Sequence, residues 1–192
     1  LKGMIGKQRF SFQDKLINGN GIIRAFDGEL NLNELLDSSN YWKLKATLGG
    51  SFVSKFNTDN NTTLFNMPKN VGATCLRMNL RYHKIRFSGE YVHKINDPYP
   101  DQNENFNYIY KNGEGILLNL GYSTKGFAID FSAKHMDNML WRSTNVNVGP
   151  TDLLIGYLPA LTKQHTYNLA ATLYPYATNF YGEIAYQADV LF

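Results

Sequence analysis

The chain lacks the features that define several common classes of protein. Its 192 residues include one cysteine, Cys75, which excludes an internal disulfide framework and a cysteine-rich zinc site. Charged residues are only 18% of the chain, the net charge is +3 and no basic block occurs, so we expect no nucleic-acid partner. No run of about 18 apolar residues exists, which argues against a membrane-spanning helix. The first residues, LKGMIGKQ, also lack the apolar core of a signal peptide.

The chain is instead rich in the residues that form strands. Aromatic residues are 14% and hydrophobic residues 43% of the composition, which favours pleated sheets and interfaces. Apolar side chains fall on every second position, most clearly in LRMNLRYHKIRFSGEYVH, residues 76–93. Alternation predicts about nine strands. Two of them, 76–82 and 85–93, lie in this stretch, and the others are at 4–13, 21–32, 42–56, 116–122, 127–134, 167–175 and 180–192. We also expect a bulge near Gly28 and a single helical turn within NELLDS, residues 33–38.

The connections between these strands differ systematically in length. Tight hairpins are expected at His83-Lys84, at 124–126 and around Tyr176. The remaining links are long and rich in Asn, Asp and Pro, at 57–70, 96–113 and 137–164. Short links therefore gather at one end of the sheet and long links at the other.

Aromatic residues also cluster near the strand ends, among them Trp42, Tyr82 and Tyr122. Together with the alternation and the unequal loops, this pattern resembles a bacterial outer-membrane β-barrel. The stretches GKQR (6–9) and LPALTKQHTYNLAATLYPYAT (158–178) are similar to an uncharacterised, porin-like outer-membrane barrel family of Bacteroidota. The resemblance implies an all-β fold, an antiparallel transmembrane barrel of up-and-down hairpins in the outer membrane. Residues 1–192 would form one such domain or part of a larger barrel.

A bilayer explains why two-faced strands would be needed. Lipid offers no water to satisfy backbone groups, so the sheet must close, its outer face must be apolar and its inner face can be polar. The residues expected to face lipid are Leu76, Met78, Leu80, Phe87, Ile129, Phe131 and Leu169. The candidates for lining a pore are Lys43, Lys45, Arg77, Arg81, Arg86, Glu90, Asp130, Lys134 and Glu183. The same charged side chains could instead form a salt-bridged wall that holds the barrel's shape.

No pattern in the sequence supports catalysis. Ser132 and His135 have opposite parity on one strand, so they cannot act together on one face. The four histidines lie at strand ends without metal-binding spacing. We therefore expect no enzymatic activity, no catalytic residues, no cofactor and no bound metal.

The function that these features favour is a passive, porin-like path for small polar solutes, with a mild preference for anions. Its partners would be the lipid bilayer of a bacterial outer membrane, including lipopolysaccharide, and other outer-membrane proteins are a further candidate. One alternative is a non-conducting scaffold barrel of an outer-membrane complex, with LLIGYLPAL, residues 153–161, as an apolar anchor. A second alternative is a soluble, lipocalin-like barrel that binds a small ligand.

Overall fold

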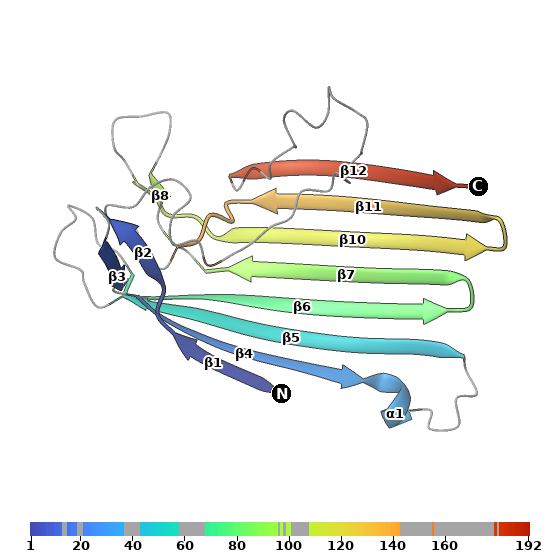
Figure 1. Ribbon diagram of the computed structural model, residues 1–192, viewed down its shortest axis with the longest axis horizontal. Coiled ribbons are helices and arrows are strands. Elements are labelled where there is room, and N and C mark those ends of the chain that lie inside the picture. Colours follow the sequence, from blue (N-terminus) through green and yellow to red (C-terminus); the bar gives the residue numbers. More distant parts are fainter. Residues whose placement is uncertain are drawn as a thin grey trace.

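The computed structural model is an all-β protein with one short helix (Figure 1). It describes residues 1–12, 15–18, 21–36, 43–57, 68–95, 97, 99–100, 108–142, 155, 179 and 181–192. Its elements are β1 (Lys2–Gly6), β2 (Arg9–Phe12), β3 (Lys15–Asn18), β4 (Gly21–Asn31), α1 (Leu32–Leu36), β5 (Leu44–Asn57), β6 (Asn70–Tyr82), β7 (Ile85–Lys94), β8 (Tyr99–Pro100), β9 (Tyr108–Ile109), β10 (Gly113–Thr124), β11 (Phe127–Asp137) and β12 (Gly182–Leu191).

Eight of these strands form one antiparallel sheet in the order β1-β4-β5-β6-β7-β10-β11-β12. Each strand pairs with the next one along the chain within this sheet, which is an up-and-down arrangement. The predicted all-β, antiparallel, up-and-down fold is therefore confirmed. The described residues leave the sheet open, with β1 and β12 as its edges, and two small sheets pair β2 with β3 and β8 with β9. The expected count of about nine strands was wrong, because alternation alone did not reveal these short strands.

The short turns lie at one end of the sheet together with α1, whereas β2, β3 and β8 lie at the other (Figure 1). The predicted turn His83-Lys84 is confirmed. The second turn is one residue shorter than expected, because Thr124 already pairs with Phe127. The Lys84 amine donates to Thr124 Oγ1 at 2.7 Å, which joins the two turns. The third predicted hairpin lies largely outside the described residues, and the strand expected at 180–192 is β12, which begins at Gly182.

The amino-terminal part departs from the expected pattern. The predicted strand 4–13 is two strands, because β1 pairs with β4 while β2 folds back onto β3. No bulge occurs at Gly28, which pairs with Gly50 in an unbroken register. The alternation is interrupted because Arg24 lies on the otherwise apolar face of β4. Its guanidinium lies 5.7 Å from the centroid of the Phe56 ring, where it gains a cation–π contact.

The expected helical turn within 33–38 is present as α1. Asn33 ties it to the sheet, because its Oδ1 accepts the Ala46 backbone N–H at 2.6 Å. The same side chain donates to the Leu44 carbonyl. These bonds hold the connection from β4 to β5 against the start of β5.

Alternation and register give the main sheet two distinct faces. One face, called the apolar face, carries Phe26, Leu48, Leu76, Met78, Leu80, Phe87, Leu118, Leu120, Ile129, Phe131, Ile184 and Tyr186. The opposite face, called the polar face, carries Asp27, Lys45, Thr47, Arg77, Asn79, Arg81, Arg86, Ser88, Asn119, Asp130, Ser132 and Gln187.

The buried apolar cluster lies over the polar side of the sheet, at the end with the long connections. There the polar face ends in Val71 and Ala73, and Trp141 from the segment after β11 packs on them. Ile155 also contacts this cluster, and its backbone N–H donates to the Trp141 carbonyl at 2.9 Å. Connections therefore cover one half of the polar face, while the half near the short turns is open.

Candidate functional site on the polar face

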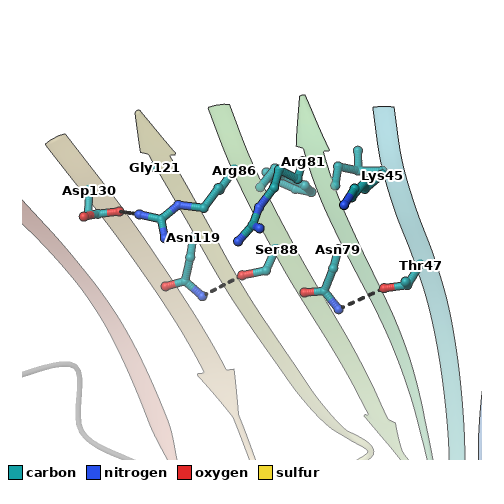
Figure 2. A pocket seen from close by; sticks show the side chains of 11 residues that line it. Lys45, Thr47, Asn79, Arg81, Arg86, Ser88, Asn119, Gly121 and Asp130 are labelled. Atoms are coloured by element: carbon teal, nitrogen blue, oxygen red, sulfur yellow. Dashed lines mark hydrogen bonds and ion pairs between the residues drawn. The ribbon is translucent and has the colours of Figure 1, made fainter. Parts of the chain in front are cut away.

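Uncharged polar side chains form a row across five strands at mid-sheet. Register places them directly opposite one another in the order Thr47, Asn79, Ser88, Asn119 and Ser132. The Asn79 amide donates to Thr47 Oγ1 at 3.4 Å, and the Asn119 amide donates to Ser88 Oγ at 3.2 Å (Figure 2). The Ser132 hydroxyl donates to Asn119 Oδ1 at 2.7 Å. The row lines the sheet with amide and hydroxyl groups that exchange hydrogen bonds with one another.

A second row, one step nearer the short turns, is strongly basic. Lys45, Arg81 and Arg86 are consecutive in register on β5, β6 and β7. Figure 2 shows their side chains on the same side of the sheet as the amide and hydroxyl row. No described carboxylate forms an ion pair with Lys45 or Arg81. Like charges directly opposite one another are unfavourable in a sheet, so this row concentrates positive potential.

Arg86 reaches an acid by crossing a whole strand. Its Nη2 lies 3.7 Å from Asp130 Oδ1 on β11, and β10 runs between them. The residue of β10 in this row is Gly121, where a Cβ would overlap the Asp130 carboxylate. The missing side chain therefore opens the path for the ion pair.

Arg77 is held in the same manner on the same face, nearer the β1 edge of the sheet. It crosses β5 at Gly49 and donates to Asp27 Oδ1 on β4 at 2.5 Å. The Ser51 hydroxyl accepts from Arg77 at 2.6 Å and donates to Asp27 at 2.6 Å. Glu90 lies directly opposite Arg77 in register, but Arg77 pairs with Asp27.

The rows enclose an open hollow of ≈ 450 Å³ on the polar face. Its walls are charged at one end and amide-lined at the other (Figure 2). The lining residues are Lys45, Thr47, Asn79, Leu80, Arg81, Arg86, Phe87, Ser88, Asn119, Gly121 and Asp130. Such a surface can hold water and polar or anionic solutes.

The covered half of the polar face contains charges that are buried and paired. Lys134 and Glu183 are only 4% and 6% exposed and lie 2.5 Å apart. Lys55 pairs with Asp97 at 2.9 Å in the same half. The Lys94 amine donates to the Leu140 carbonyl at 2.6 Å. Lys55 and Lys94 therefore fix connecting segments onto the sheet, whereas the pair of Lys134 and Glu183 joins β11 to β12.

The structure separates the predicted pore-lining residues into groups. Lys45, Arg81, Arg86 and Asp130 line the hollow, with Arg77 and Glu90 on an adjoining part of the polar face. Lys134 and Glu183 lie in the covered half, away from the hollow. Lys43 precedes β5, with a positive φ of 51°, and is exposed.

Of the residues expected to face lipid, Leu76, Met78, Leu80, Phe87, Ile129 and Phe131 share the apolar face. Leu169 lies outside the described residues. Whether this face meets lipid stays a prediction.

Sequence reasoning missed the acid partner Asp27 and the amide and hydroxyl row. A signal for part of that row existed in the turns. Asn79 and Ser88 are equally distant from His83-Lys84, and Asn119 and Ser132 are equally distant from Lys125-Gly126, so each pair must face across its hairpin. The register between β7 and β10 had no such signal, because the link between them is long.

The described part of the chain lacks two further kinds of feature. It contains no group of three or more His, Cys, Asp or Glu residues that could hold a metal ion. None of its helices has the length and apolar character needed to cross a membrane.

The described chain is thus an antiparallel β-meander protein with an exposed apolar face and a basic hollow on the other face. It belongs to the family of unknown function DUF6029, whose model matches residues 1–192. No curated protein and no solved structure matches it. The family's description gives no location, source or activity, so the outer-membrane and Bacteroidota parts of the resemblance stay predictions.

Proposed function

We propose that the main sheet is part of the wall of an outer-membrane β-barrel, a porin-like passive path for small polar solutes that mildly favours anions. In this arrangement the apolar face meets lipid and the polar face meets a water-filled lumen. The observation that carries the proposal is the exposure of large apolar side chains along one whole face of the sheet.

That exposure extends from β4 to β12. Leu76 is 65% and Tyr186 71% exposed, although both lie within long paired strands. The other large exposed side chains on this face include Phe26, Leu48, Phe52, Leu118, Leu120, Ile129, Phe131, Ile184 and Val190. Soluble monomers rarely expose apolar patches above a few hundred Å², whereas the lipid-facing wall of a barrel requires one.

The lengths of the strands also support a membrane wall. The six strands from β5 to β12 in the main sheet have 10 to 14 residues each. A strand needs about 9–11 residues to cross the hydrocarbon layer. Tyr82 and Tyr122 lie on the apolar face close to the short turns, where aromatic side chains with one polar end suit the interface.

The direction of the edge strands is compatible with closure. Lipid requires every strand edge to be paired. The eight strands alternate in direction, so β1 and β12 run antiparallel to each other. They can therefore be joined directly or through an even number of further strands, as in bacterial barrels with even strand numbers.

The position of the core argues against a soluble ligand-binding barrel. Such a barrel would bury its apolar face inward around the ligand. In this chain the buried cluster of Val71, Ala73 and Trp141 covers the opposite face instead. The open basic hollow in turn favours a path for solutes over a non-conducting scaffold barrel.

Electrical recording in a planar lipid bilayer tests the proposal. The full-length protein, extracted in detergent, should give stepwise ohmic conductance with a reversal potential that favours anions. The double variant Arg81→Gln/Arg86→Gln should lower the anion preference and keep the conductance steps. Insertion without conductance would support the scaffold, and solubility without detergent would support the lipocalin-like alternative; either result would refute the porin-like function.

A further inference from the structure

The basic row carries more charge than the fold needs for its own pairing. We propose that Lys45, Arg81 and Arg86 form a saturable binding site for phosphate dianions, either as inorganic phosphate or as a phosphate group on a small solute. This inference deepens the proposed function by naming a solute class, and it rests on that function for access from the lumen.

The charge of the site matches a dianion. Three cations face one carboxylate of the hollow, Asp130, which leaves a local excess of two positive charges. A phosphate group carries about −1.5 to −2 at neutral pH. Of the other acids on this face, Asp27 pairs with Arg77, and Glu90 and Asp189 are not among the residues that line the hollow.

The donor groups suit phosphate oxygens. Two guanidinium groups side by side on one hairpin can each offer a fork of N–H donors, a geometry suited to phosphate and carboxylate. The Thr47 and Ser88 hydroxyls each accept an amide N–H, so the hydroxyl hydrogens remain available to donate. The site therefore combines charge with directed donors on two adjoining rows of one hollow.

The cost of the arrangement in the unliganded chain supports a ligand. Arg81 lies between Lys45 and Arg86 with like charges on both sides, an arrangement that destabilises a sheet. Among the described residues, the ion pair of Arg86 is the long, solvent-exposed one with Asp130 at 3.7 Å, which offsets little of this repulsion. A bound dianion would relieve it.

Titration calorimetry with inorganic phosphate tests the inference without requiring conductance. The full-length protein in uncharged detergent, at low ionic strength and about pH 8, should bind phosphate saturably. Arg81→Gln should weaken the affinity at least about tenfold, because it removes a charge-assisted donor. Arg24→Gln, the same change on the apolar face, should alter it less than about twofold.

Two more arms define what the site recognises. Arg81→Lys keeps the charge but loses the fork, and should fall between the wild type and Arg81→Gln. Acetate, a monoanion, should bind more weakly than phosphate, and a sugar phosphate should compete with inorganic phosphate. Absence of saturable phosphate binding, equal affinity in Arg81→Gln, equally tight acetate binding or failure of a sugar phosphate to compete would overturn the proposal.

The outcomes also separate the two proposals. Phosphate binding that depends on Arg81 in a chain that does not conduct would refute the porin-like function and keep the site. Conductance without saturable phosphate binding would refute the site and keep the path.

Discussion

At the scale of single residues, the arginines of the polar face differ in their partners. Arg77 is bound to a carboxylate and a hydroxyl, Asp27 and Ser51. Arg81, four residues further along β6 on the same face, forms no ion pair with the described residues and has cations on both sides. One arginine therefore supports the structure of the sheet, and the other is available to a solute.

This difference predicts opposite effects of the same substitution. Arg77→Gln should lower the free energy of unfolding by about 1 kcal/mol, since it removes charge-assisted hydrogen bonds at a partly exposed site. Arg81→Gln should leave stability unchanged or raise it by a few tenths of a kcal/mol, because repulsion is relieved. Urea unfolding in detergent micelles measures both. Equal losses in the two variants would contradict the assignment.

Only part of this could be predicted from the sequence. Parity placed Arg77, Arg81 and Arg86 on one face, because side chains in a strand alternate. The pairing of Arg77 with Asp27 could not be predicted, since the two residues lie 50 positions apart and on strands that are not neighbours. An arginine side chain can reach across a neighbouring strand, so its partner depends on the register of three strands. Alternation predicts the face of each residue but not the register.

At the scale of elements, the chain after β11 turns back over the polar face. Asn138 makes this turn with a left-handed φ of 48°, and its side chain donates to the Lys111 carbonyl at 2.6 Å. The segment then passes close to Gly113, where a Cβ would overlap the Asn138 carbonyl oxygen and lie 3.1 Å from Met139 Sδ. The fit depends on the absence of a side chain at Gly113.

Gly113→Ala should therefore displace this segment. Because a backbone oxygen cannot rotate away as a side chain can, we expect a loss of about 1–3 kcal/mol and greater exposure of Trp141. Fluorescence in a Trp42→Phe background would report a red shift of the Trp141 emission. Gly115→Ala is the matched control, since its nearest contact is 3.7 Å. A shift of the same size in both variants would show that the tight fit is not the cause.

The strands were easier to predict than their boundaries. Alternation identified β5, β6, β7, β10, β11 and β12, because each has one consistently apolar face. It failed for residues 4–13, because alternation alone does not mark the break between β1, which joins the main sheet, and β2, which pairs with β3. It failed at Arg24 because an aromatic ring can accept a cation on an otherwise apolar face.

At the scale of the whole molecule, two neighbouring residues should experience different surroundings. Leu118 lies on the apolar face and Asn119 on the polar face of β10. With Cys75→Ser as background, a cysteine at 119 in reconstituted vesicles should react with a membrane-impermeant maleimide. A cysteine at 118, labelled before reconstitution with an environment-sensitive dye, should be quenched by lipids that carry a quencher in the acyl chain.

The reverse pattern would invert the proposed orientation of the sheet. Equal reactivity of both positions with the impermeant reagent would show that neither face meets lipid. This experiment depends on orientation alone, so it is independent of conductance and of phosphate binding.

Gly121, which lies beneath the Arg86 side chain, makes the ion pair sensitive to the register of β10. Sliding β10 by a single position would bring Leu120 or Tyr122 to the place of Gly121 and would turn the wrong side of that strand toward the arginine. The ion pair between Arg86 on β7 and Asp130 on β11 can therefore form only when β7, β10 and β11 are all in their native register. A sheet with β10 out of register would lack this ion pair, so the pair is specific to the native alignment of β7, β10 and β11.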